Sequence, residues 1–201
     1  MARALEQNKQ DELDKLREEV LACTACQLHK TRTNVVFGEG SPDAKLMFIG
    51  EAPGYWEDQQ GRPFVGSAGK VLDKLLASIG LSRSEVYIAN VLKCRPPKNR
   101  EPRPEEIKAC TPFLDRQMAI IRPKMICTLG NYSTSYVLGK FGIKASSMSS
   151  VHGRVYRCSS LLLGEVLVIP TYHPATVLYK PYMMDTIKKD WEVIESVYKS
   201  L

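Results

Sequence analysis

The sequence predicts an α/β fold: a single-domain three-layer α/β/α sandwich around a central, mainly four-stranded parallel sheet. Short apolar runs alternate with stretches of helical periodicity along the 201 residues. This alternation is typical of parallel sheets, because two parallel strands need a long crossover that is usually a helix. The chain shows no internal repeat and no linker, so residues 1–201 are predicted to form one domain.

The first half of the chain is predicted to contain one strand between two helices. Residues 1–22 carry an amphipathic helix from about residue 9, because apolar side chains recur there at helical spacing. An apolar run over residues 45–49, stopped by Gly50, is predicted to be a buried strand. The next helix has Ser67 as its N-cap and ends at Gly80. The apolar face of the first helix is formed by Leu13, Leu16, Val20 and Leu21.

The second half continues the alternation of strands and helices. Residues 86–89 form a second predicted strand, which ends at Asn90. Pro104 opens the next helix, since proline is preorganised for the first helical turn. The remaining predicted elements are strands over 125–129 and 166–169, a short helix after Gly130, a hairpin strand over 154–158 and a final helix over 184–194.

Four loops follow the predicted parallel strands at the edge where ligands bind in this fold class. In open parallel sheets, ligands occupy the crevice beyond the carboxyl ends of the strands. The segments at that edge are residues 50–66, residues 90–104, the chain after Gly130 and residues 171–176. We therefore expect the functional residues in these segments.

The first of these loops is rich in glycine and leads into a helix. Residues 50–69 hold five glycines. Glycine allows backbone amides to approach a ligand closely, and the start of a helix leaves backbone N–H groups free. The segment fits either a ligand cradle or a structured turn, and its glycine content does not choose between them. It is not a P-loop, because no Gly-Lys-Ser/Thr sequence follows the glycines.

Two polar side chains at strand ends are candidates for binding a ligand. Asn90 offers a hydrogen-bond donor and an acceptor, which suit an amide-like or pyrimidine edge, although asparagine at a strand end is commonly a turn residue. His173 follows the fourth strand, is fixed by Pro174, and could donate to negative charge that develops on a ligand. His29 and His152 are predicted to be ordinary surface histidines.

Four of the six cysteines have the spacing of metal ligands. They are Cys23 and Cys26, a C-x2-C pair, and Cys94 and Cys110, which are separated by fifteen residues. Four thiolates suit either a zinc ion or an iron–sulfur cluster, and spacing alone does not choose between them. Cys127 and Cys158 fall in a predicted strand and in the hairpin, where a free cysteine is common.

Composition and charge exclude several classes of protein and favour a polyanionic partner. The chain has a net charge of +6 and lacks the apolar run of about 20 residues that a membrane helix needs. It also lacks a segment like a signal peptide, so a cytoplasmic, intracellular protein without membrane contact is expected. Basic residues gather in residues 93–103, and residues 116–164 contain no Asp or Glu. Two such runs favour nucleic acid as the partner.

Three segments together resemble the family 4 uracil-DNA glycosylases, the iron–sulfur branch of the uracil-DNA glycosylase superfamily. The segments are GEAPGYWEDQQGRPFVGSAG (residues 50–69), NVLKCRPPKNREPRPEEIKAC (residues 90–110) and YHPA (residues 172–175). The resemblance covers most of the chain, from Cys23 to about Trp191. It implies a parallel-sheet sandwich and a monofunctional DNA glycosylase. Such an enzyme flips uracil out of DNA, hydrolyses its N-glycosidic bond and leaves an abasic site during base excision repair.

The resemblance also implies a structural [4Fe–4S] cluster and no dissociable catalytic metal. The implied cluster ligands are Cys23, Cys26, Cys94 and Cys110. The implied uracil pocket contains Glu51, Ala52, Pro53, Glu57, Phe64, Asn90 and His173. Within it, Phe64 would stack on the flipped uracil, and Asn90 would contact its Watson–Crick edge.

Three pocket residues are assigned to catalysis. His173 would stabilise negative charge at O2 of the departing uracil, and Asn90 would reject cytosine through mismatched hydrogen bonds. Some relatives have an aspartate that positions the attacking water where this chain has Ala52, so the adjacent Glu51 is our hypothesis for that role. Glu57 is the candidate residue for excluding thymine through a steric clash with its methyl group.

Uracil-containing DNA, single- or double-stranded, is the predicted partner of a protein expected to be a monomer. The predicted DNA contacts are Lys93, Arg95, Lys98, Asn99, Arg100, Pro174, Ala175 and Leu178. A replication-clamp contact has no support from a motif in residues 1–10. Two alternatives come from other classes: a non-catalytic nucleic-acid-binding or phage-polymerase-associated module on the same fold, and a zinc-stabilised nucleotide-binding protein.

Overall fold

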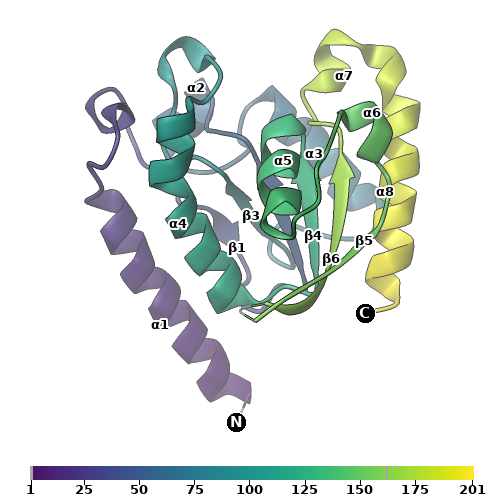
Figure 1. Ribbon diagram of the computed structural model, residues 1–201, viewed down its shortest axis with the longest axis horizontal. Helices are drawn as coiled ribbons and strands as arrows, with labels where there is room; N and C mark the ends of the chain where they lie inside the picture. The colour runs from purple at the N-terminus through teal and green to yellow at the C-terminus, as the bar shows by residue number, and fades with distance from the viewer. Residues whose placement is uncertain (1, 162) are drawn as a thin grey trace.

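Figure 1 shows the fold in a computed structural model, which describes residues 2–161 and 163–201. The middle layer is a six-stranded sheet in the order β1-β3-β2-β4-β6-β5. Its strands are β1 (Glu39–Gly40), β2 (Leu46–Gly50), β3 (Tyr87–Asn90), β4 (Met125–Leu129), β5 (Tyr156–Ser160) and β6 (Gly164–Thr171). Strands β3, β2, β4 and β6 are parallel, and the edge strands β1 and β5 are antiparallel to their neighbours. The predicted four-stranded parallel sheet is confirmed as the centre of a wider sheet.

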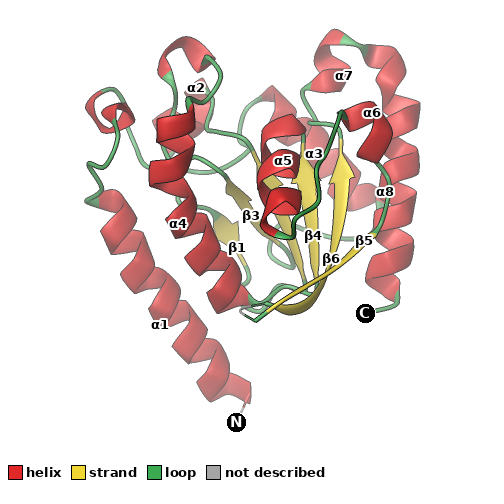
Figure 2. Ribbon diagram, viewed as in Figure 1, coloured by secondary structure: helices red, strands yellow, loops and turns green. Residues whose placement is uncertain are grey.

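Helices cover both faces of this sheet, as Figure 2 shows, so the predicted three-layer α/β/α class is confirmed. The α-helices are α1 (Ala2–Leu21), α2 (Tyr55–Gln60), α3 (Ser67–Ser78), α4 (Pro104–Ile121), α5 (Asn131–Lys140), α6 (Met148–Val151), α7 (Thr176–Tyr179) and α8 (Met184–Lys199). Short 3-10 helices span Gln27–Lys30, Pro97–Asn99 and Pro181–Met183. Across the two described stretches of chain, no helix is both long enough and apolar enough to cross a bilayer.

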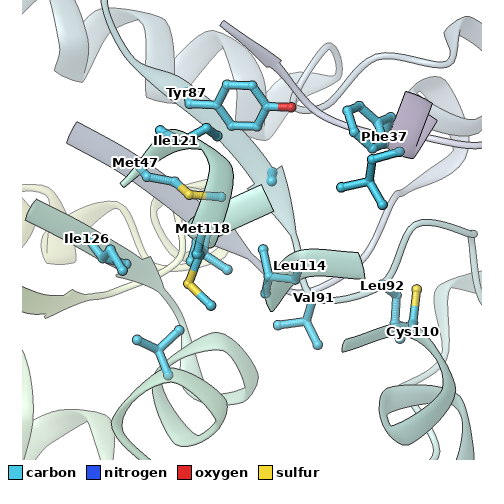
Figure 3. Packing of buried hydrophobic residues seen from close by; sticks show 14 of the residues in the cluster. Phe37, Met47, Tyr87, Val91, Leu92, Cys110, Leu114, Met118, Ile121 and Ile126 are labelled. Atoms are coloured by element: carbon cyan, nitrogen blue, oxygen red, sulfur yellow. The ribbon is translucent and has the colours of Figure 1, made fainter. Parts of the chain in front are cut away.

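Alternating side chains of the central strands supply two hydrophobic cores. Met47 and Ile49 of β2 share one core with α1, α4 and α5. Leu46 and Phe48 point into the opposite core, which contains residues of α3 and α8. Figure 3 shows part of the first core, where Met118 of α4 belongs to the same cluster as Met47. The period of two along β2 explains why its run of apolar residues is buried on both faces.

Some local predictions are wrong at the ends of helices. Ser67 is the first residue of α3 and not its N-cap; Gly66 holds the cap position, and its carbonyl accepts a bond from the Lys70 N–H. Leu21 is 50% exposed, because α1 ends there and its side chain leaves the apolar face. The edge strand β1 is not predictable from periodicity, since it has only two residues.

The carboxyl ends of the parallel strands meet at one edge of the sheet. Gly50 of β2 lies opposite Asn90 of β3. Leu129 of β4 lies opposite Thr171 of β6. The loops that carry the candidate functional residues therefore leave the sheet from the same edge, as the sequence predicts.

Candidate active site

A cleft of about 580 Å³ lies at this edge of the sheet and is lined by segments far apart in the sequence. Its size falls within the usual range of ligand pockets, roughly 300–1,000 Å³. The structure brings all seven predicted pocket residues into its lining: Glu51, Ala52, Pro53, Glu57, Phe64, Asn90 and His173. The convergence of the seven residues in one cleft is therefore observed, whereas their functional roles remain predictions.

Asn90 presents an unpaired acceptor in this cleft. It is the last residue of β3 and only 2% exposed, and its Oδ1 has no hydrogen-bond partner among the residues that the structure describes. A buried acceptor without a partner costs about 1–3 kcal/mol, so it marks a place where a ligand donor fits. Gly50 makes room for this group: a Cβ there would lie 2.4 Å from Oδ1 and 2.7 Å from the Phe64 ring.

His173 stands against the aromatic ring of Phe64 and is held in one tautomer. The two ring centroids are 5.5 Å apart, with planes inclined by 28°. The backbone N–H of Ala175 donates to Nδ1 of His173 at 3.1 Å. Because Nδ1 accepts this bond, the neutral ring carries its proton on Nε2.

The charge state of His173 follows from its place in the cleft. Loss of contact with bulk water lowers the pKa of His173 to about 4, and the nearby Glu57 carboxylate opposes this shift. The imidazole is therefore neutral at pH 7. It offers an N–H donor without a positive charge.

The loop that carries Phe64 is strained and held from two sides. Phe64 has a φ of 52°, in the left-handed region, which costs a residue other than glycine about 1–3 kcal/mol. The Arg83 guanidinium donates to the carbonyl oxygen of Phe64. One carboxylate oxygen of Glu57 accepts the N–H groups of Val65 and Gly66, both at 2.9 Å. Sequence reasoning missed Arg83, since nothing in its local sequence links it to the loop.

Glu51 is a half-buried carboxyl group at the start of the loop after β2. Burial raises its pKa, and the charge of Glu101 raises that pKa further. Such a group accepts a proton more readily than an exposed glutamate does. This property suits the predicted contact with a water molecule, although the role itself remains a prediction.

Lys93 is not a surface residue, and its predicted contact with DNA is wrong. The side chain is fully buried. Its Nζ donates to the carbonyl oxygen of Asn90 at 2.9 Å and to Oε1 of Gln117 at 2.6 Å. Burial lowers the pKa of Lys93 to about 8. Lys93 thus ties the end of β3 to α4, which a basic run in the sequence cannot reveal.

The other predicted DNA contacts separate into exposed and engaged residues. Lys98 and Asn99 are exposed, and Leu178 is 46% exposed. Arg100 forms two bonds to the buried Glu106 carboxylate, at 2.9 and 2.5 Å, which offset its charge. Arg95 is partly buried and donates to Asn99 at 2.7 Å, and Ala175 lines the cleft beside Asn99, Arg100 and Leu178.

Pro174 is buried and is removed from the predicted DNA contacts. It lies in the turn that the Thr176 N–H closes by donating to the His173 carbonyl at 2.8 Å. The cleft lining also contains three exposed aromatic residues that sequence reasoning missed: Tyr55, Trp56 and Tyr179. An aromatic residue in a short helix without a clear apolar period gives no signal of its exposure, which explains the omission.

A second pocket gathers the four cysteines with metal-ligand spacing. Cys23, Cys26, Cys94 and Cys110 line this apolar pocket together. Arg32 donates to Sγ of Cys94 at 3.3 Å, and the Lys93 backbone N–H donates to Sγ of Cys110 at 3.1 Å. Among the residues that the structure describes, no three His, Cys, Asp or Glu side chains are arranged to hold one metal ion.

The fold and the cleft define a class: α/β proteins with a ligand-sized cleft at the carboxyl edge of a parallel sheet. Comparison with known families is more specific, because the profile of the uracil DNA glycosylase superfamily matches residues 37–197. The chain belongs to this superfamily.

Individual relatives are similar along nearly the whole chain. The chain is 50% identical to the Type-4 uracil-DNA glycosylase of Sulfurisphaera tokodaii over 188 residues, which cover 93% of this chain and 85% of that protein. It is 47% identical to the Type-4 uracil-DNA glycosylase of Saccharolobus solfataricus over 94% of this chain and 88% of that protein. It is 46% identical to the Archaeoglobus fulgidus protein of the same name, with 92% of each chain covered.

Proposed function

We propose that this protein is a monofunctional uracil-DNA glycosylase, a DNA-repair hydrolase that releases uracil from DNA and leaves an abasic site. The observation that carries the proposal is the buried, unpaired Oδ1 of Asn90 beside the ring of Phe64. Membership of the superfamily and high identity to three proteins named Type-4 uracil-DNA glycosylase support it. All seven proposed uracil-binding residues share one cleft.

Asn90 supplies the discrimination between uracil and cytosine. Uracil has a proton on N3 that can donate to Oδ1, whereas N3 of cytosine carries no proton. Bound cytosine would leave Oδ1 unpaired, and unpaired buried groups are penalised strongly. The enzyme must first extrude the nucleotide, because in a duplex the Watson–Crick edge of the base is paired and its faces are stacked.

Phe64 supplies the aromatic surface on which the base stacks. A base between two rings needs about 7 Å, twice the roughly 3.5 Å contact distance of carbon atoms. Phe64 and His173 are closer, with centroids 5.5 Å apart. Uracil therefore stacks on the part of the Phe64 ring that His173 leaves uncovered.

Hydrolysis breaks the bond between C1′ of the sugar and N1 of uracil, and uracil departs with the electron pair. The Nε2–H of His173 donates to O2 and stabilises the negative charge that develops there. A water oxygen forms the new bond to C1′, and Glu51 orients that water and accepts its proton. The uracil anion then takes up a proton, so that the products are uracil and an abasic strand.

The pH dependence of excision follows from the two titrating groups. Because the pKa of His173 is about 4, its ring is neutral across the neutral range, and activity should not fall as the pH rises through about 6.5. Activity should fall instead on acidification, as Glu51 becomes protonated. Because the pKa of Glu51 is raised, this fall should occur at a higher pH than for an ordinary glutamate. Single-turnover rates from acidic to neutral pH test this.

The Glu51→Gln variant should lose that acidic limb together with most of its activity. If the variant cleaves at a near-normal rate, Glu51 does not position the water. A fall in activity between pH 6 and 8 that disappears in the His173→Gln variant would show that His173 acts as a charged imidazolium instead.

The loop of Phe64 should respond to a change at Gly69, a buried residue of α3. A Cβ at this position would lie 1.7 Å from the carbonyl oxygen of Phe64, so the loop must shift. We expect Gly69→Ala to lower excision by about a hundredfold, as misplacement by an ångström can do. Gly139→Ala is the matched control, because a Cβ at Gly139 in α5 meets open space. Excision by the Gly69→Ala variant at the rate of this control would contradict the proposed role of the loop.

We propose that the four-cysteine pocket holds a structural [4Fe–4S] cluster through Cys23, Cys26, Cys94 and Cys110. Four thiolates on one zinc ion would lie about 4 Å apart, whereas in a cluster each thiolate binds its own iron and the sulfurs lie further apart. The four cysteines line one apolar pocket, so their thiolates can surround a single group, which supports this proposal. The N–H bonds to two of the sulfurs are typical of cluster sites. Bound there, the cluster links the end of α1 to α4.

Protein purified without oxygen should therefore be brown and contain iron and sulfide in equal amounts. Cys110→Ser should lose the colour and melt at a lower temperature, because serine keeps the volume but is a poor iron ligand. Cys127→Ser in the core of β4 is the control that leaves the colour intact. Metal analysis that finds one zinc per chain and no iron would contradict the cluster.

We also propose that residues 1–201 act as one domain, since α1 and α4 share a core with the sheet.

The substrate is DNA with uracil. The test is a labelled oligonucleotide with one uracil, incubated with the protein and a chelator and then treated with alkali. Strand breakage at uracil, and none in a matched thymine oligonucleotide, is expected. Binding without breakage would favour a non-catalytic DNA-binding module.

A further inference from the structure

Two neighbouring aromatic side chains of α2 stand at the cleft and have no part in the proposed reaction. Tyr55 is 48% exposed and Trp56 is 57% exposed. Both belong to the lining that also contains Phe64 and Asn90. Contiguous apolar surface that is exposed to water is a common mark of a binding site. Two large aromatic side chains beside a cleft therefore indicate that a ligand covers them.

Arg95, Tyr55 and Trp56 contact one another in this order and form a row beside the cleft. The rings of Tyr55 and Trp56 meet edge to face, with centroids 5.1 Å apart and planes inclined by 78°. The Arg95 guanidinium lies over the Tyr55 ring, 5.1 Å from its centroid, and donates to Asn99 at 2.7 Å. At the other end, Trp56 Cδ1 lies 3.5 Å from the point where a Cβ of Gly66 would be. A row fixed in this way loses little conformational entropy when a ligand binds.

The chemistry of the row fits an unstacked nucleobase. Aromatic rings combined with cations form the sites that hold single-stranded nucleic acid, because every base has a face that can stack. The exposed Lys98 and the partly buried Arg95 supply positive charge for the phosphates. A DNA strand whose uracil lies in the cleft must continue past its rim, so the nucleotide next to the uracil passes this row.

We propose that Tyr55 and Trp56 form a platform on which an unpaired base next to the extruded uracil stacks, which makes single-stranded or locally melted DNA the preferred substrate. This inference rests on the proposed glycosylase function and names the form of its substrate. In an intact duplex the neighbouring base stays paired and stacked within the helix, and its face is closed to Trp56.

The experiment measures the binding of a fluorescein-labelled, uracil-free oligonucleotide as a single strand and as a blunt duplex. We expect Trp56→Ala to weaken single-strand binding about tenfold or more, the usual effect of removing one stacking side chain. Duplex binding should change by less than about twofold. Trp56→Phe should retain most of the affinity. Leu161→Ala is the control, because it removes an exposed apolar side chain at the opposite end of β6, in the turn that follows β5.

Tryptophan fluorescence gives a second readout that does not depend on affinity. The chain has two tryptophans, and Trp191 is 1% exposed and stacked on Phe48, with centroids 5.2 Å apart. Quenching by an added single strand therefore reports Trp56, and it should vanish in Trp56→Phe. Unchanged emission of the parent, or unchanged single-strand affinity of Trp56→Ala, would overturn the platform.

Uracil excision by the parent, measured in parallel, separates this inference from the proposed function. If the parent excises uracil and Trp56→Ala binds the single strand as tightly as the parent, the platform is wrong and the function stands. If the parent releases no uracil while Trp56 still controls single-strand binding, the glycosylase proposal fails and the platform is supported.

Discussion

Replacement of His173 by alanine is expected to lower the single-turnover rate of uracil excision by about 10²–10³-fold, the usual effect of removing one preorganised donor from a developing anion. The Ala175 N–H fixes the ring with its proton on Nε2, so no reorganisation is needed when the charge forms. The rate is measured with enzyme in excess over a uracil oligonucleotide, so that product release does not obscure the chemical step.

A second variant separates catalysis from packing at this position. His173→Gln keeps an N–H donor and should recover part of the lost rate, whereas an apolar residue of similar size, as in His173→Leu, should not. Binding of uracil-free DNA should remain within about twofold of the parent in all three variants. An alanine variant that excises uracil within a few-fold of the parent rate would remove His173 from the mechanism.

Replacement of Asn90 by leucine should produce the second large effect, with opposite consequences for activity and stability. Excision should fall by about a hundredfold or more, because the variant cannot pair with N3–H of uracil. The free protein should unfold at the same or a higher temperature, since leucine has a similar volume and removes a buried acceptor that has no partner in the described part of the chain. Single-turnover excision and thermal unfolding are measured on the same preparation.

Asn90→Ala in the same assays shows how much of any stability change comes from lost volume. A marked destabilisation in both variants would mean that Asn90 has a structural role, and that its Oδ1 is not reserved for a ligand. Retention of uracil excision in the leucine variant would contradict the assignment of base recognition to this residue.

The sequence predicts the layers of the fold and the composition of the cleft because both depend on local patterns. Short apolar runs that alternate with helical periodicity define the parallel sheet, and the rule for strand-end crevices places Asn90 and His173 at one edge before any contact is known. The wider sheet is harder to predict. Edge strand β1 has two residues, and its pairing with β3 depends on the folded chain.

The supports of the site depend on long-range contacts that no local pattern encodes. Arg83 reaches the carbonyl of Phe64 across 19 positions of sequence, and Lys93 reaches Gln117 across 24. A lysine in a basic run has the same local signature whether it faces solvent or the core, so the DNA contact predicted for Lys93 is wrong for a physical reason. The exposure of Tyr55 and Trp56 is likewise set by the folded surface.

The proposed reaction is tested most directly by mass spectrometry of a single-stranded oligonucleotide with one uracil, after incubation with the parent protein and a chelator. Hydrolysis predicts free uracil and an intact strand with an abasic site in equal amounts, with no product from matched strands that carry cytosine or thymine. The His173→Ala and Asn90→Leu variants should yield the same products at far lower rates. An unchanged oligonucleotide mass after incubation with protein that binds it would contradict the proposed function.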